Sequence, residues 1–259
     1  MIGRWWRRRR DARALRERAI PDELWLDTLR AFPFLAQRPL ADLMALREMT
    51  SRFLDRKEFD AAGGLELTDA MAVAVAAQAC VPVLRLGLDW YDGFVGIVMH
   101  PDEVVVPRQW TDESGIVHEG EEVLSGEATP GGPLMLSWHD VAMAGDSAAE
   151  GYNVVIHEFA HVIDMCGGGL ADGMPPIADA ALARRWQQVL PREFEAFAAQ
   201  VDRGEDTFLD PYAAQGLAEF FPVASEAFFV APRDLMQAHP ALYELLSAFY
   251  RQDPARHAR

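Results

Sequence analysis

Apolar residues recur along much of the chain at spacings of three and four, the period of an amphipathic helix. The first clear case is the stretch that contains Leu24, Leu26, Leu29 and Phe32. By this pattern the sequence predicts helices over residues 22–36, 40–53, 151–166, 178–202, 217–230 and 240–250. Most of the chain is therefore expected to be helical.

The longest apolar stretch, "AMAVAVAAQACVPVLRLGL", covers residues 70–88. Gln78, Pro82 and Arg85 interrupt it, and a proline removes a helical hydrogen bond and clashes with the preceding turn. A membrane span would need about 20 predominantly apolar residues. The stretch therefore predicts a buried core helix that ends near Ala79, and no transmembrane segment is expected.

Between residues 95 and 141 the pattern changes to short apolar or alternating runs separated by proline, glycine and aspartate. These runs, "FVGIVMH", "EVVVP", "GIVHEGEEVLSGEA" and "PLMLSWHDV", predict a small, mainly antiparallel sheet. Helices, a small sheet and helices again make the expected fold class α+β, mostly helical. We expect a basic tail at 1–20 and one unit over 21–259. That unit would comprise a helical part at 21–93, the sheet at 94–148 and a second helical part at 149–254.

Charge is distributed unevenly along the chain. Residues 1–18 hold eight arginines and two acidic residues, a formal charge of +6, whereas the whole chain carries −16, which leaves −22 for the remainder. A body this acidic repels phosphate backbones, so direct nucleic-acid binding by the folded part is not expected. The arginine tail, which flanks Trp5 and Trp6, could contact anionic lipid or an acidic partner, although a solvated terminus is the simpler interpretation.

Two further features bear on where the protein acts. Charged residues follow the arginine tail where a secretory signal would need an apolar segment, so a cytoplasmic location is expected. The chain has only two cysteines, Cys80 and Cys166, which are too few for a disulfide scaffold and lack the pairing of a metal site. Both are expected to be reduced thiols.

The segment "VVIHEFAHVID", residues 154–164, places two histidines four residues apart on a predicted helix. His157 and His161 then project from one face and can bind one ion, while Glu158 reaches a ligand on the open side of that ion. The alternative is a core helix that happens to carry histidines. Burying these three polar side chains without compensation would cost several kcal/mol, which favours the metal site.

A catalytic zinc needs a third protein ligand and an open position for water. The best candidate is Glu219 in "DPYAAQGLAEFFPVASEAFF", on a helix whose apolar face would pack beside the first. Glu226 lies seven residues later on the same face, so it could be the ligand instead or hold a histidine from behind. Spacing alone leaves both alternatives open.

Two other polar residues near the motif are candidates for supporting roles. Asp164 lies one helical turn beyond His161 and could orient an imidazole or face solvent. Asn153, four residues before His157, is a weaker candidate of the same kind. The segment "GPLMLSWHD" directly precedes the metal helix, and we expect it to be an edge strand that could pair with an extended peptide.

Several separated motifs occur in an order that resembles one known family. The motifs are "ACVPVLRLGLDWYDGF", "NVVIHEFAHVIDM", "LDPYAAQGLAEFF", "ASEAFF" and "ALYELLSAFYRQDP". Together, from about residue 24 to 254, they resemble the Mlc titration factor A family of zinc-dependent peptidases. The C-terminal pattern also resembles the catalytic domain of anthrax lethal factor, where a tyrosine likewise precedes the ligand glutamate by seven residues.

The resemblance implies a gluzincin-like metallopeptidase core that holds one Zn²⁺ per chain. It implies His157, His161 and Glu219 as the zinc ligands, Glu158 as the general base and Tyr212 as the residue that faces the reacting carbonyl. The chain departs from the family at Pro222, where relatives commonly have alanine. A proline there predicts that the ligand helix either starts late or kinks just after Glu219.

Two functions of different classes follow from the resemblance. The first is a cytoplasmic zinc peptidase with aminopeptidase-like cleavage of short peptide substrates. The second is a regulatory protein that sequesters a transcriptional repressor of sugar uptake, with the zinc site secondary. The intact set of His157, Glu158 and His161 favours the enzyme, because a purely structural zinc site has no need of Glu158.

Overall fold

The computed structural model describes residues 13, 15, 17–111, 117–128, 131–145, 151–166 and 169–258, which leaves most of the arginine tail outside the described residues. Helices make up most of the described chain. Up to residue 143 they are α2 (Asp22–Ala31), α3 (Pro33–Ala36), α4 (Leu40–Arg56), α5 (Asp69–Val83) and α6 (Trp138–Met143). In the C-terminal half they are α7 (Val154–Asp164), α8 (Ala180–Asp202), α9 (Leu217–Val230), α10 (Pro232–Ala238) and α11 (Pro240–Tyr250).

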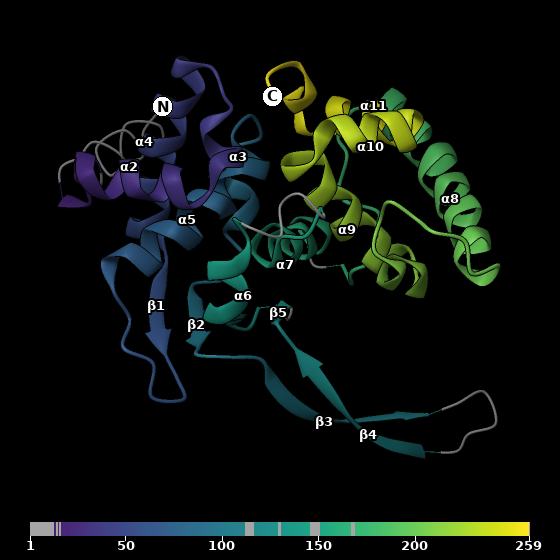
Figure 1. Cartoon of the computed structure of the whole chain (residues 1–259), viewed down its shortest axis with the longest axis horizontal. Helices are drawn as coiled ribbons and strands as arrows, with labels where there is room; N and C mark the ends of the chain where they lie inside the picture. Colours follow the sequence, from purple (N-terminus) through teal and green to yellow (C-terminus); the bar gives the residue numbers. More distant parts are fainter. Residues whose placement is uncertain are drawn as a thin grey trace.

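The strands form two separate sheets. A four-stranded sheet has the order β1 (Glu58–Ala61), β2 (Gly96–His100), β6 (Leu134–Ser137), β5 (Gly126–Ala128). The pairs β1–β2 and β2–β6 are parallel, and only β5–β6 is antiparallel. The other two strands, β3 (Val104–Thr111) and β4 (Val117–Leu124), form an antiparallel hairpin that projects from the body (Figure 1). The fold is α+β, as predicted.

The four-stranded sheet is mixed, which corrects the expectation of a mainly antiparallel one. The reason is β1, which comes from residues 58–61, well before the segment with the strand pattern. Its sequence "EFDA" contains one large apolar residue, Phe59, and its side chains are mostly exposed, so no alternation marks it as a strand. Helix α5 then connects β1 to β2, and a crossover helix is what parallel neighbours require.

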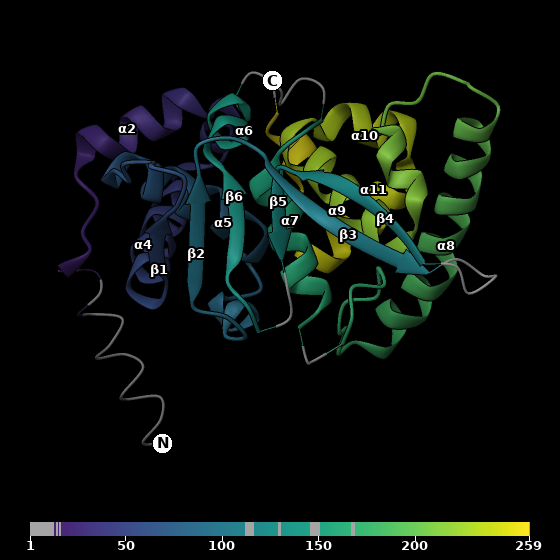
Figure 2. The same cartoon turned by 90° about the horizontal axis from the view of Figure 1, so that it is seen from below.

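The segment predicted as an edge strand occupies a different place. Strand β6, within "GPLMLSWHD", lies between β2 and β5 and has partners on both sides. The edge next to the C-terminal helices is β5, which contacts α7 (Figure 2). An extended peptide could therefore add to this end of the sheet only at β5.

Two differences between the predicted and observed helices occur at prolines. The helix predicted over 22–36 is divided into α2 and α3 at Phe32, because Pro33 follows it and disfavours helical conformation there. Helix α5 continues through Pro82 to Val83 rather than ending near Ala79. Its last carbonyls find a partner from far away in the sequence: the side chain of Gln252 donates to Val81 O at 2.8 Å. A local pattern cannot reveal such a contact.

Aromatic side chains form two clusters, one packed on helix α7 and one packed on helix α9. In the first cluster Phe159 of α7 packs against Tyr91 of the 3-10 turn η1 (Leu88–Tyr91), with ring centroids 4.8 Å apart, and against Phe53 of α4 at 5.6 Å. In the second cluster Trp186 of α8 packs against Phe249 of α11 at 5.0 Å and against Phe221 of α9 at 5.5 Å. Helix α7 lies between the N-terminal and C-terminal helices (Figure 1) and contacts α5 on one side and α9 on the other.

The described cysteines are both free: Cys80 is buried, and Cys166 is partly buried. Among the described residues, no helix combines the length and apolar character that crossing a bilayer requires.

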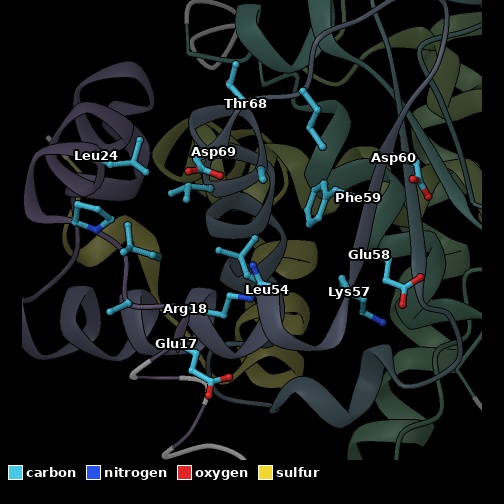
Figure 3. A pocket seen from close by; sticks show the side chains of 16 residues that line it. Glu17, Arg18, Leu24, Leu54, Lys57, Glu58, Phe59, Asp60, Thr68 and Asp69 are labelled. Atoms are coloured by element: carbon cyan, nitrogen blue, oxygen red, sulfur yellow. The ribbon is translucent and has the colours of Figure 1, made fainter.

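A hollow of about 600 Å³ lies between α2, β1 and the start of α5. Leu24 of α2 and Phe59 of β1 line opposite sides of it (Figure 3). None of His157, His161 and Glu219 lines this hollow. It is therefore separate from the candidate metal ligands.

Candidate metal centre

Asn153 caps the N-terminus of helix α7. Asn153 accepts a hydrogen bond from the backbone N–H of Ile156 at 2.9 Å, the usual role of asparagine at a helix N-terminus. Its side-chain amide donates to Oε1 of Gln78 in α5 at 2.7 Å. The expectation that Asn153 orients an imidazole was wrong, because its side chain starts the helix and ties it to α5.

His157, His161 and Glu219 bring three donor atoms together. Nε2 of His157 lies 3.2 Å from Nε2 of His161, and each nitrogen lies 3.3 Å from Oε2 of Glu219. Donors at the corners of a tetrahedron, about 2.0–2.1 Å from a central ion, are about 3.3–3.4 Å apart. The group thus has the donor set and the spacing of a three-ligand metal site.

The third member of the group comes from the first turn of α9. The helix begins at Leu217, two residues before Glu219, so the late start considered for the sequence is excluded. Pro222 lies inside the helix rather than at its beginning. Glu219 is thereby carried on regular helix next to α7, and α9 is one of the elements that α7 contacts most.

Glu226 holds His157 from the side away from this group. Its Oε1 lies 2.7 Å from Nδ1 of His157, and its Oε2 accepts a hydrogen bond from the backbone N–H of Asn153 at 2.5 Å. An imidazole that donates from Nδ1 has its lone pair on Nε2, the atom that faces His161 and Glu219. The geometry therefore separates the two glutamates: Glu219 joins the donor group, and Glu226 orients a histidine.

Asp164 is buried and holds a loop rather than an imidazole. Its Oδ2 accepts the backbone N–H groups of Asp172 and Gly173, at 2.8 and 2.7 Å. Burial raises the pKa of this carboxyl to about 6, although the two backbone hydrogen bonds lower it. The carbonyl of Gly173 in turn accepts from Nε1 of Trp186 at 2.8 Å, so Asp164 links the end of α7 to α8. Neither role expected for Asp164, orienting an imidazole or facing solvent, describes it.

Glu158 is buried against the edge strand of the sheet. Its side chain is 5% exposed, and its Oε2 has no hydrogen-bond partner in the described part of the chain. A Cβ at Gly126 would lie 2.6 Å from Cγ and 2.7 Å from Oε1 of Glu158. Only a glycine fits beside this carboxylate. We did not identify Gly126 from the sequence, although a glycine within a strand can mark such a close approach.

Tyr212 lies beside the group without belonging to it. It is in the 3-10 turn η3 (Pro211–Gln215), where Asp210 accepts its backbone N–H at 2.8 Å. Its ring centroid is 6.2 Å from that of His157, and its side chain is 42% exposed. The hydroxyl is thus accessible to a molecule that approaches the histidines.

The charges around His157 compensate one another. Burial alone would lower the pKa of its imidazole, but the carboxylates of Glu226 and Glu219 outweigh burial and raise the pKa well above its usual value. Burial likewise raises the pKa of Glu158, and the two histidines offset part of that rise. For Glu219 burial is outweighed by the hydrogen bonds from His157 and His161, which lower its pKa. The surroundings thus favour the charged forms of His157 and Glu219 and the neutral form of Glu158.

Known proteins match this chain over nearly its whole length. The family model of the glucose-regulated metallo-peptidases M90 matches residues 3–251. The Mlc titration factor A of Salmonella arizonae is 38% identical over 242 residues, which is 92% of this chain and 94% of that protein. The Mlc titration factor A of Yersinia pestis (strain Pestoides F) is 38% identical over 232 residues, 89% of this chain and 84% of that protein.

Proposed function

The chain belongs to the family of glucose-regulated metallo-peptidases M90, as its sequence motifs indicated, and we propose that it is a zinc-dependent peptidase. The observation that carries this proposal is the group of His157, His161 and Glu219, whose donor atoms lie 3.2–3.3 Å apart. Two imidazoles and one carboxylate are a common ligand set of catalytic zinc. One Zn²⁺ per chain would be held there, with a fourth position left for water or substrate.

The chemistry requires a base next to that fourth position. Zinc, when bound, supplies a Lewis acid that polarises a carbonyl and lowers the pKa of water toward about 7. Glu158 follows His157 directly, and its Oε2 has no partner within the described residues. We propose that this oxygen accepts the proton of the attacking water and later passes it to the leaving amine.

Tyr212 is proposed to assist at the carbonyl that is attacked. Its ring lies near that of His157, and it is not one of the three ligands. A hydroxyl placed there can donate a hydrogen bond to the oxyanion that develops during the attack.

The substrate is proposed to be a short, extended peptide that adds to the free edge of β5. This strand is only three residues long and contacts α7, so it offers few main-chain hydrogen bonds, and those lie close to Glu158. A short edge suits the aminopeptidase-like cleavage that the family resemblance implies.

The first prediction is that Glu158→Gln retains zinc and loses peptide cleavage. The amide preserves the size of the side chain but cannot take the proton of water, and loss of a general base typically costs about 100- to 10,000-fold in rate. Elemental analysis and cleavage of a fluorogenic peptide library measure the two effects. Glu195→Gln, an exposed glutamate on α8, is the control and should cleave normally. Wild-type turnover in Glu158→Gln would refute the proposed base.

A second candidate function rests on the names of the relatives. Both compared proteins are called Mlc titration factor A, and a titrating protein acts by binding a regulator. We propose that this chain also binds a transcriptional repressor, which requires the cytoplasmic location expected from its sequence. Binding of a purified repressor to Glu158→Gln as tightly as to the wild type would make this function independent of cleavage. Absence of binding to either protein would exclude it.

A further inference from the structure

A cleft of about 180 Å³ lies where the C-terminal turn meets α3, α4 and the end of α5. Its lining is rich in arginine although the chain as a whole is acidic. The charged residues that line it are Arg38, Arg85, Arg251 and Arg256, with Asp42 and Asp253. None of the metal-site residues lines this cleft, so an inference about it goes beyond the proposed function.

Both acidic groups of the cleft already have partners. Asp42 forms an ion pair with Arg85. Asp253 accepts a hydrogen bond from the hydroxyl of Tyr243 at 2.6 Å. Arg251 and Arg256, by contrast, make no side-chain hydrogen bond or ion pair with any described residue. Two guanidinium groups therefore line the cleft without a protein anion of their own.

A third guanidinium, that of Arg38, is half-buried at the same place. Nη1 of Arg38 donates to the carbonyls of Phe34 and Leu35 at 2.6 and 3.4 Å, and its other nitrogens have no acceptor in the part of the chain that the structure describes. Burial lowers the pKa of this guanidinium to about 10, and Asp42 offsets only part of the effect. A half-buried cation with unused donors would gain from an anion in the cleft.

The backbone conformation of Arg251 also indicates that its side chain has a use in the cleft. Arg251 has φ +54°, the left-handed conformation in which glycine is favoured, and no other non-glycine residue in the described ranges has a positive φ. The residues around it are firmly held: Gln252 donates to Val81 O at 2.8 Å, and the backbone N–H of Ala255 donates to the Tyr243 hydroxyl at 3.0 Å. An arginine thus occupies a position where glycine would cost less, which points to a use for its side chain.

We propose that this cleft binds a small phosphate-bearing anion through the guanidinium groups of Arg38, Arg251 and Arg256. The planar fork of guanidinium donors matches phosphate oxygens, and several such groups around one cleft suit a multiply charged oxyanion better than a single carboxylate. A cavity needs only about 10–15 Å³ to hold a water, so 180 Å³ admits a phosphate with a small organic group. Phe34, Phe229 and Pro232 provide an apolar wall for that group.

Calorimetric titration of the zinc-loaded full chain with inorganic phosphate and with glycerol 3-phosphate, at low ionic strength, tests the proposal. Acetate serves as the singly charged comparison and should bind more weakly than either. Arg251→Gly and Arg256→Gln should each weaken phosphate binding by about tenfold or more, because each removes a charge-assisted donor. Arg203→Gln, which removes an arginine paired with Glu205 at the far end of α8, should bind within about twofold of the wild type.

The melting temperature of phosphate-free Arg251→Gly separates ligand binding from a structural role. Glycine relieves the left-handed backbone, so the variant should melt at the same temperature as the wild type or higher. If the side chain of Arg251 had a structural role, Arg251→Gly would melt at a lower temperature than the wild type. The effect of Arg256→Gln on phosphate affinity would then be the independent test of binding. Equal phosphate affinity in the wild type and the Arg251→Gly, Arg256→Gln double variant would place the anion elsewhere, for instance at zinc, and would overturn the proposal. So would the absence of phosphate binding to the wild type.

Discussion

Gly126 determines where the carboxylate of Glu158 lies, because the side chain of Glu158 occupies the space that a Cβ would fill. Gly126→Ala would place a methyl group 2.6–2.8 Å from three atoms of Glu158 and force that side chain to move. A displacement of about 1 Å can cost about 100-fold in rate. We expect turnover to fall by at least about tenfold while zinc content stays normal.

Gly93→Ala is the matched control, because nothing lies within 4 Å of the added Cβ and Gly93 does not have a positive φ. It should leave turnover of the fluorogenic peptide unchanged. Normal turnover in Gly126→Ala would mean that the position of Glu158 does not matter for cleavage, and would count against its role as the base.

The proposed role of Tyr212 is to stabilise the transition state of peptide cleavage by donating a hydrogen bond. Tyr212→Phe removes one hydroxyl near His157 without removing a ligand. Loss of one donor to an oxyanion typically costs about 100- to 1000-fold in kcat, or about 3–4 kcal/mol, with a smaller effect on KM. Steady-state cleavage at equal zinc content measures both constants. A variant within about threefold of wild-type kcat would make Tyr212 an ordinary surface tyrosine.

The sequence predicted that His157 and His161 lie together because helical spacing is a local property. His157 and His161 are four residues apart, and an unbroken helix must present them together. The choice between Glu219 and Glu226 was beyond local reasoning, since both lie on the same face of α9. It depends on how α9 packs against α7, which brings Glu226 to the Nδ1 side of His157 and to the N–H of Asn153. Gly126 escaped prediction because its neighbour Glu158 is distant in sequence.

Among the secondary-structure elements, α7 and α9 together make the site, and Glu226 is the residue that joins them. One carboxylate oxygen contacts His157, and the other accepts the first N–H before α7. Glu226→Gln keeps the size of the side chain but replaces one acceptor by a donor. Either Nδ1 of His157 or the backbone N–H of Asn153 then loses its hydrogen-bond acceptor.

We expect Glu226→Gln to lower zinc affinity by about 10- to 100-fold, the usual effect of losing a group that orients a ligand. Competition with a chromophoric chelator measures this affinity. Glu193→Gln is the control: Glu193 lies 3.4 Å from a nitrogen of His239 and is not one of the three candidate metal ligands, so its loss should not change zinc affinity. A larger loss in Glu226→Gln than in Glu219→Ala would mean that the two glutamates had been assigned the wrong way round.

The elements that the sequence predicted correctly are those with long, regular periodicity. Helices α9 and α11 have the bounds that their apolar spacing predicts, and α8 begins within two residues of its predicted start. The sheet was harder, because β1 is short, exposed and separated from β2 by a whole helix. Parallel pairing across such a distance leaves no alternating pattern to read. For the same reason β6 was taken for an edge strand although it lies inside the sheet.

Across the whole molecule, the candidate metal site connects α7, which contacts α5 of the N-terminal helices, to α9 of the C-terminal helices. A ligand that binds only the folded protein stabilises it by about 2.7 kcal/mol when its free concentration is 100 times its Kd. For a domain of 150–250 residues, each kcal/mol shifts the melting temperature by about 2–4 °C. The unfolded chain lacks the three-ligand geometry, so zinc should act as such a ligand.

Removal of zinc by EDTA should therefore lower the melting temperature by about 5–10 °C, and equimolar zinc should restore it. The control is the His157→Ala, His161→Ala double variant, in which Glu219 alone remains of the donor group and EDTA should have no effect on melting. Scanning calorimetry of both proteins, with and without chelator, makes the comparison. An equal shift in the double variant would show that EDTA acts at another place. No shift in the wild type, at verified zinc loss, would mean that the helices pack just as well without the ion and that zinc serves catalysis alone.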